Sequence, residues 1–162
     1  MTILKNQTLS KYLDQLSSKD PVPGGGSAAA LVGALGASLI CMAARYSQGR
    51  NQSKVIEAKI SDHLRKAEKI RKRLTELVDL DAKAYLAVVK TRKGDLAKRK
   101  KALKKAQAVP LEVCRLCYAG IQLTPFLTKK GNPYLLSDVE CAAAMLLAAA
   151  RSALANVKAN EQ

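Results

Sequence analysis

Pro21-Val-Pro-Gly-Gly-Gly-Ser27 opens the stretch that decides the fold, an uncharged run that continues to Ala44. We predict a helix from about Ala28 to Tyr46 with Ser27 as its N-cap, because a serine directly before an apolar run favours a helix start. The three glycines can adopt positive φ and bring bare N–H groups close to a ligand, and a helix N-terminus attracts anions. The alternative is that the glycines only permit a tight turn into a closely packed helix, since a glycine-rich turn is a weak motif.

Composition favours a single all-α domain. The 162 residues suit one domain with a core, and 48% of them are hydrophobic although only 4% are aromatic. Helix-forming residues dominate, and no alternating β-branched runs indicate strands. The helix after the glycines is apolar nearly all round and carries a strip of small residues, namely Ala30, Gly33, Ala34 and Ala37. We therefore predict an antiparallel helical bundle with this Ala/Gly-rich helix at its centre, dimerising across it.

The formal charge of +15 predicts attraction to a polyanion, whether a nucleic acid, an anionic membrane or an anionic small molecule. The uncharged run up to Ala44 is long enough to cross a bilayer, but its glycine, alanine and serine content favours a buried helix instead. Four cysteines lie in apolar helical patterns without a preceding secretory core, which favours a reduced cytoplasmic protein. Cys114-Arg-Leu-Cys117 has no second CxxC motif beside it, and His63 is the only histidine, so we expect no metal site.

Two helices follow from periodicity. We expect a short amphipathic helix over Leu9–Leu16, capped by Thr8, and a long helix from about Ser53 to Lys90. The apolar stripe of the long helix consists of Ala67, Ile70, Leu74, Leu77, Val78, Tyr85 and Val88.

One acidic residue interrupts that stripe. Asp81 lies four residues after Leu77 and four before Tyr85, so it shares their face, whereas Asp79 points elsewhere. A carboxylate on a buried stripe loses solvation, which raises its pKa and suits it to proton transfer. The alternative is a buried aspartate that a hydrogen bond or an ion pair satisfies. Asp81 is the catalytic candidate that the pattern favours.

The second half of the chain is also helical. A helix begins near Asp95, carries a dense basic block that we interpret as a solvated face, and either stops near Ala108 or kinks at Pro110. Residues 111 to about 127 continue as helix. Ser137-Asp-Val-Glu140 fits a capping box at the start of the last helix, which accounts for Ser137 and Asp138 without a functional role.

Six short motifs occur in order along the chain: Pro23-Gly-Gly-Gly-Ser27-Ala-Ala, Leu77-Val-Asp-Leu-Asp-Ala82, Val109-Pro110-Leu111, Gly131-Asn132, Ser137-Asp138 and Asn156-Val157. Together they resemble the formiminotransferase–cyclodeaminase family, specifically its cyclodeaminase or methenyltetrahydrofolate cyclohydrolase domain. The resemblance runs from about Leu9 to Val157. It implies an all-helical homodimer, or a larger homo-oligomer, that acts on one-carbon folates without a metal or another cofactor.

The resemblance implies two alternative reactions. One closes 5-formimidoyl-tetrahydrofolate to 5,10-methenyl-tetrahydrofolate with loss of ammonia, and the other opens the methenyl compound with water. The resemblance implies that either Asp79 or Asp81 is an acidic catalytic residue. The helical periodicity favours Asp81. The expected substrate contacts are Gly24, Gly25, Gly26 and Ser27 at the glycine loop and, on resemblance alone, Asn132, Ser137 and Asp138. The basic charge would then attract the glutamate tail of folate.

Family members usually continue past the Asn-Val motif with a further helical segment, whereas this sequence stops at Gln162. We expect this difference to leave apolar surface for a partner subunit to cover, or to reduce activity. The alternative function is a non-catalytic basic protein that binds nucleic acid through the surface of residues 65–105. That reading accounts for the charge, but no recognised nucleic-acid motif supports it, and few aromatic residues are present for stacking.

Overall fold

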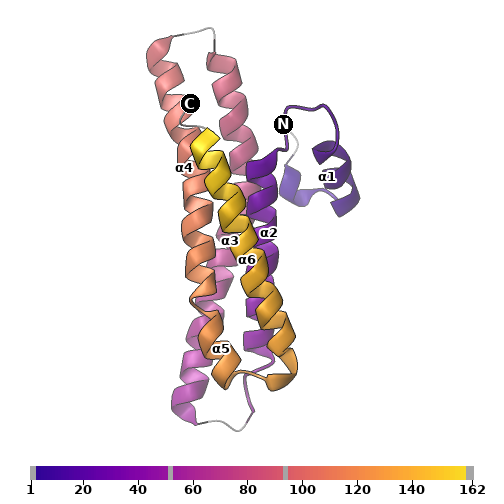
Figure 1. Ribbon diagram of the computed structural model, residues 1–162, viewed down its shortest axis with the longest axis vertical. Coiled ribbons are helices and arrows are strands. Elements are labelled where there is room, and N and C mark those ends of the chain that lie inside the picture. The colour runs from indigo at the N-terminus through magenta and orange to yellow at the C-terminus, as the bar shows by residue number, and fades with distance from the viewer. Residues whose placement is uncertain (1–2, 51–52, 93–94, 160–162) are drawn as a thin grey trace.

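The computed structural model describes residues 3–50, 53–92 and 95–159. Four long helices run alternately up and down to form an antiparallel bundle (Figure 1). They are α2 (Gly25–Arg45), α3 (Lys54–Thr91), α4 (Leu96–Ile121) and α6 (Leu136–Ala159). The shorter elements are α1 (Leu9–Leu16), α5 (Thr124–Lys130) and the 3₁₀ turns η1 (Leu4–Asn6) and η2 (Pro133–Leu135). The described residues contain no strand, so the prediction of an all-α bundle is confirmed.

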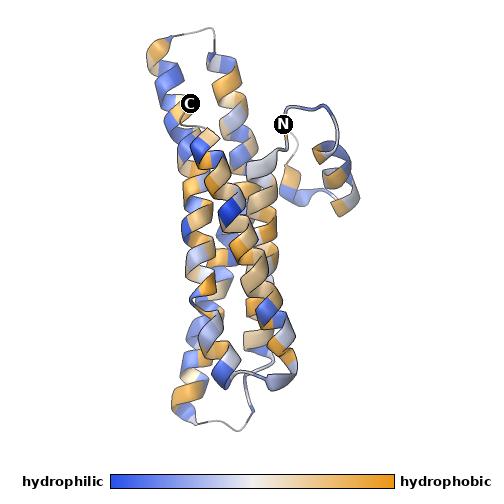
Figure 2. Ribbon diagram, viewed as in Figure 1, coloured by the Kyte–Doolittle hydropathy of each residue, from blue (hydrophilic) through white to orange (hydrophobic). Residues whose placement is uncertain are grey.

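Helix α2 lies at the centre because its small residues let neighbouring helices approach closely. A Cβ on Gly33 would lie 2.9 Å from the Sγ of Cys117 on α4. A Cβ on Gly36 would lie 2.9 Å from the Cγ of Leu146 on α6. Figure 2 shows α2 and α6 mostly in hydrophobic colours, whereas α3 and α4 alternate between hydrophobic and hydrophilic residues. The prediction of a central Ala/Gly-rich helix is therefore confirmed.

By length and composition alone, two helical stretches could cross a membrane, Gly25–Arg45 and Pro133–Ala159. The apolar window of the first is 61% buried in the bundle, as expected for a core helix. The window of the second is only 22% buried, so α6 has a large apolar surface that this single chain does not cover.

Helix α3 begins directly after Ser53, close to the predicted start, and the Ser53 side chain accepts a hydrogen bond from the Ile56 N–H. The end of α3 and the start of α4 project beyond α2 and α6 as a helical hairpin (Figure 1). Tyr85 lies on this projecting part and is 49% exposed. Its predicted burial in the apolar stripe is therefore wrong, because the bundle does not extend far enough to cover it.

Three predicted helix boundaries are wrong. Helix α2 begins at Gly25 with Gly24 as N-cap, so Ser27 lies inside the first turn. Helix α4 continues through Pro110, so the expected stop near Ala108 is wrong. It ends at Ile121 and not near residue 127, because a separate α5 with a proline in its first turn follows. Helix α6 begins at Leu136, directly after η2, so Ser137 lies inside the helix and is not its N-cap.

Candidate active site

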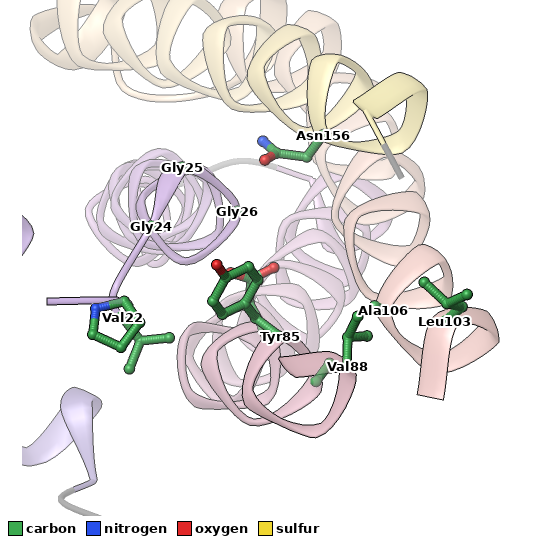
Figure 3. A pocket seen from close by; sticks show the side chains of 12 residues that line it. Val22, Gly24, Gly25, Gly26, Tyr85, Val88, Leu103, Ala106 and Asn156 are labelled. Atoms are coloured by element: carbon green, nitrogen blue, oxygen red, sulfur yellow. The ribbon is translucent and has the colours of Figure 1, made fainter. Parts of the chain in front are cut away.

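A cavity of about 360 Å³ lies at the end of the bundle where α2 begins. Four segments meet there, the chain from Pro21 to Gly26, the last third of α3, the first half of α4 and the end of α6 (Figure 3). The lining residues are Pro21, Val22, Gly24, Gly25, Gly26, Asp81, Ala84, Tyr85, Val88, Leu103, Ala106 and Asn156. The cavity thus brings the glycine loop together with Asp81, which lies more than fifty residues away in the sequence.

The Asp81 carboxyl group lies against the first turn of α2. It accepts a hydrogen bond from the Ser27 backbone N–H. Gly24, the N-cap of α2, has no side chain that could cap the helix. A carboxylate from α3 therefore takes the position that a capping side chain of α2 would normally occupy.

The environment of Asp81 favours its protonated form. Burial raises the pKa of Asp81, and the hydrogen bond from Ser27 offsets part of that effect. A carboxyl group with a raised pKa at the wall of a cavity is suited to giving and taking protons.

The glycines let the Asp81 carboxyl group lie close to the α2 backbone. They do not adopt an unusual backbone conformation. A Cβ on Gly26 would lie 2.6 Å from the Cγ of Asp81, so a side chain there would displace the carboxyl group. A Cβ on Gly25 would make ordinary contact with Asn156, at 3.5 Å from Nδ2, and one on Gly24 would meet nothing within 4 Å. Among the described glycines, only Gly49 has a positive φ, so the loop does not use the positive φ that its glycines permit.

Asp79 lies on a different side of α3 from Asp81 and does not line the cavity. Its side chain is 5% exposed, and its Oδ1 accepts hydrogen bonds from the backbone N–H of Leu4 at 2.6 Å and of Lys5 at 3.4 Å. These contacts hold η1 against α3. The prediction that the two carboxylates point in different directions is confirmed, since two residues on a helix differ by about 200°.

The Ser27 side chain is also turned away from the cavity. It is fully buried, and its Oγ is 3.0 Å from the hydroxyl of Tyr12. Only the backbone N–H of Ser27 points toward Asp81.

The other three candidates lie at the opposite end of the bundle. The Asn132 N–H donates to Ser47 Oγ at 2.8 Å, and its Nδ2 donates to the Tyr46 carbonyl at 3.3 Å, just beyond the C-terminus of α2. Ser137 and Asp138 follow in the first turn of α6. Because the 21 residues of α2 span about 30 Å, one chain does not bring these three to the Asp81 cavity.

Sequence reasoning assigned no role in the site to Tyr85 or Asn156. Both point into the space beside the glycines, Tyr85 from α3 and Asn156 from α6 (Figure 3). The Nδ2 of Asn156 donates to the Ser152 carbonyl at 2.8 Å, which holds the amide in place. The available signals were the four-residue spacing of Tyr85 from Asp81 and the Asn-Val motif itself.

The hairpin beside the cavity is strongly basic. Its cationic residues, among those described, are Lys83, Lys90, Arg92, Lys98, Arg99, Lys100, Lys101, Lys104 and Lys105. None of them forms a salt bridge within the described part of the chain. The hairpin therefore presents unneutralised positive charge next to the cavity.

Comparisons with known proteins agree with this architecture. Residues 8–162 match the family described as Formiminotransferase-cyclodeaminase. The chain is 36% identical over 165 residues to the methenyltetrahydrofolate cyclohydrolase of Methylorubrum extorquens, covering 96% of this chain and 79% of that protein. It is 32% identical to the formimidoyltransferase-cyclodeaminase of Rattus norvegicus, covering 97% of this chain but only 31% of that protein.

A solved structure is also similar. The formiminotetrahydrofolate cyclodeaminase of Thermotoga maritima superposes with a TM-score of 0.92 at 27% identity, covering 98% of this chain and 80% of that one. None of these matches supports the alternative of a nucleic-acid-binding protein.

Proposed function

Because the chain belongs to the formiminotransferase-cyclodeaminase family, we propose that it is a one-carbon folate enzyme with its chemistry at the Asp81 cavity. Its reaction is either cyclodeamination of 5-formimidoyl-tetrahydrofolate or hydrolysis of 5,10-methenyl-tetrahydrofolate. The observation that carries the proposal is the position of the Asp81 carboxyl group, which lies partly buried between the first turn of α2 and an open cavity.

Asp81 acts in this proposal as a general acid and base. In cyclodeamination, N10 of the folate attacks the formimidoyl carbon and loses its proton, and Asp81 protonates the nitrogen that leaves as ammonia. In hydrolysis, Asp81 accepts a proton from the water that attacks the methenyl carbon. The bond from that carbon to N5 then breaks, N5 takes up the proton, and the formyl group stays on N10. General acid–base assistance of this kind contributes about 10²- to 10⁴-fold to the rate. Both reactions exchange bonds at the one-carbon group with proton transfer and without a change of oxidation state, so the proposal includes no redox cofactor.

Asp79 is the weaker catalytic candidate. Its carboxylate accepts hydrogen bonds from η1 and does not line the cavity. Both observations support the choice of Asp81.

The cavity walls offer contacts for the two halves of the substrate. The N–H groups of Gly25 and Gly26 lie in the first turn of α2, where no helical carbonyl precedes them, so they can donate to a carbonyl or carboxylate of the folate. The ring of Tyr85, together with Val88 and Leu103, supplies an apolar wall against which an aromatic ring system can pack. The Asn156 amide supplies a further polar contact.

The basic hairpin is the proposed site of the glutamate tail. It adjoins the cavity through Leu103 and Ala106, and its lysine side chains can pair with carboxylates. We expect KM to fall as the tail is lengthened and this difference to shrink as salt is added, because surface charges are screened. A Lys101→Glu/Lys104→Glu variant should lose the preference for the longer tail. An unchanged preference would contradict this part of the proposal.

A second copy of the chain is the proposed partner. Helix α2 presents an outward stripe of apolar side chains that are only partly buried, and α6 beside it is mostly uncovered. The stripe consists of Leu31, Val32, Leu35, Leu39 and Met42. A symmetric, antiparallel pairing across this face would cover both helices. It would also bring Asn132, Ser137 and Asp138 of each copy toward the cavity end of the other, which is how these residues could contact substrate.

Leu35 tests this pairing because it is 48% exposed at the middle of the stripe. Leu35→Lys should convert a dimer into monomers in analytical ultracentrifugation, since a lysine there would be buried without a partner. An unchanged sedimentation mass, or a monomeric wild-type protein, would contradict the pairing.

Two assays decide between the reactions. Purified protein receives 5,10-methenyl-tetrahydrofolate in one and 5-formimidoyl-tetrahydrofolate in the other, and the methenyl absorbance is followed in each. A cyclohydrolase accelerates its loss, whereas a cyclodeaminase accelerates its appearance. The Asp81→Asn protein is the control for uncatalysed turnover, and a wild-type protein that matches this control in both assays would contradict the proposal.

A further inference from the structure

The segment before the glycine loop forms an arm beside the bundle. It consists of η1 and α1, and Figure 1 shows α1 standing apart from the four long helices. Two side chains of the arm are buried in the bundle, Leu4 at 5% and Tyr12 at 4% exposure. Leu9 and Leu13 on α1 face outward and are at least half exposed. The arm is thus attached at two points.

Each attachment point involves an acidic residue of the Asp79-Leu-Asp81 motif. At the first point, Asp79 accepts hydrogen bonds from the backbone of Leu4 and Lys5. At the second, the Tyr12 hydroxyl lies 3.0 Å from Ser27 Oγ, and the N–H of the same Ser27 donates to Asp81. Tyr12 is therefore linked to Asp81 through a single residue.

The first turn of α2 needs such a contact. Its N-cap and first two positions are all glycine, so these residues have no side chains that could pack and fix the turn against α3. Ser27 is the first residue of the turn with a side chain, and that side chain is fully buried against Tyr12.

We infer that Tyr12 is a positioning residue for Asp81, holding Ser27 so that its N–H stays directed at the carboxyl group. Asp79 contributes by fixing the other end of the arm. The two aspartates of the motif then have separate tasks, one attaching the arm and one facing the cavity. This inference rests on the proposed function for its effect on catalysis, whereas the effect on the Asp81 carboxyl group is independent of it.

The surroundings of Asp81 leave few other groups that could set its proton affinity. Helix α2 presents only glycines and Ser27, α4 presents Leu103 and Ala106, and α6 presents the neutral Asn156. The titratable groups nearby are Tyr12 on α1 and Tyr85 on α3. Burial raises the pKa of Tyr12, so its hydroxyl stays protonated and uncharged at working pH.

Tyr12→Phe tests the inference because it removes one oxygen and keeps the ring in the core. The carboxyl carbon of Asp81 is titrated by ¹³C NMR, with its signal assigned from its loss in Asp81→Asn. A looser Ser27 N–H stabilises the carboxylate less, so we expect the pKa of Asp81 to rise by about half a unit or more. The limb of the pH–rate profile that depends on Asp81 should move upward with it. We expect kcat to fall about three- to tenfold with KM nearly unchanged.

A second variant, Ser27→Ala, tests the same contact from its other side. If the two hydroxyls act together, adding Ser27→Ala to Tyr12→Phe should change the pKa of Asp81 little further, as in a double-mutant cycle for a coupled pair. Tyr118→Phe is the matched control, because Tyr118 lies on α4 with a 65% exposed side chain and does not line the cavity.

The outcomes separate the inference from the proposed function. An unchanged Asp81 titration and pH profile in folded Tyr12→Phe or Ser27→Ala protein would overturn the positioning role. If the titration moves in Tyr12→Phe while Asp81→Asn keeps full activity, the positioning role stands and the catalytic assignment of Asp81 falls.

Discussion

At one end of the bundle, the Ser47 hydroxyl accepts a hydrogen bond from the Asn132 N–H and donates to the Ala43 carbonyl. At the other end, the Asp81 carboxyl group receives the Ser27 N–H and borders an open cavity. Both ends join α2 to a distant part of the chain through a buried or partly buried polar side chain. The Ser47 end uses its polar groups to close the fold, whereas the Asp81 end directs a proton-carrying group at space that a ligand can fill.

The largest effect should come from Asp81→Asn, which keeps the size of the side chain and removes the transferable proton. We expect turnover to fall about 10²- to 10⁴-fold, measured through the methenyl absorbance. The fold should be retained, as circular dichroism would show.

Asp81→Asn should also change how the free energy of unfolding depends on pH. Burial raises the native pKa of Asp81, so the folded chain binds this proton more tightly than the unfolded chain does. The contribution of Asp81 to wild-type stability therefore falls as pH rises through its native pKa, and Asp81→Asn should remove that fall. A variant whose stability follows the same pH dependence as wild type would contradict the burial argument.

Gly26→Ala should have the next largest effect. Its Cβ would lie 2.6 Å from the Cγ of Asp81, so the carboxyl group must move or the helix must shift. We expect a loss of about 1–3 kcal/mol in the free energy of unfolding, as for overpacked sites, together with loss of activity. Gly24→Ala is the matched control for stability, because its Cβ would meet nothing within 4 Å. Equal melting temperatures for the two variants would show that Asp81 does not lie against Gly26.

Ser47→Ala addresses the opposite end. Removing the buried hydroxyl leaves the Asn132 N–H without its acceptor, which should cost about 1–2 kcal/mol in the free energy of unfolding. Turnover per folded molecule should fall much less than in Asp81→Asn, because Ser47 acts only by holding Asn132 in place. Urea titration and the absorbance assay measure the two quantities, and a large loss of kcat with unchanged stability would reverse the roles assigned to the two ends.

Gly25→Ala should have the smallest effect on folding and a selective effect on binding. Its Cβ would make ordinary contact with Asn156, so the fold accommodates it, but a methyl group would stand beside the proposed substrate contact. We expect KM to rise several-fold, or about 1 kcal/mol in binding, with kcat less affected. An unaltered KM would limit the loop to a packing role.

The sequence was sufficient where local signals decide the structure. Thr8 caps its helix as predicted, and the long helix begins close to Ser53 as expected, because each residue precedes a periodic apolar run. The placement of Asp81 on the same face of α3 as Leu77 also followed from spacing alone, because residues four apart on one helix share a face.

The sequence was insufficient where a distant residue decides the structure. Helix α2 starts at Gly25 and not after Ser27, because Asp81 from another helix receives the N–H of its first turn. Tyr85 shares the phase of buried residues, yet it is exposed because α3 projects beyond the other helices. Asn132, Ser137 and Asp138 were grouped with the glycines by resemblance, and only the three-dimensional structure places them at the opposite end.

The most direct measurement is an NMR titration of ¹⁵N-labelled Asp81→Asn protein with 5,10-methenyl-tetrahydrofolate, which this variant should bind without rapid turnover. The account predicts that the amide signals of Gly25, Gly26 and the Asn156 side chain shift with added folate. Unmoved signals at these three groups, with folate bound elsewhere on the bundle, would contradict the assignment of the Asp81 cavity as the active site.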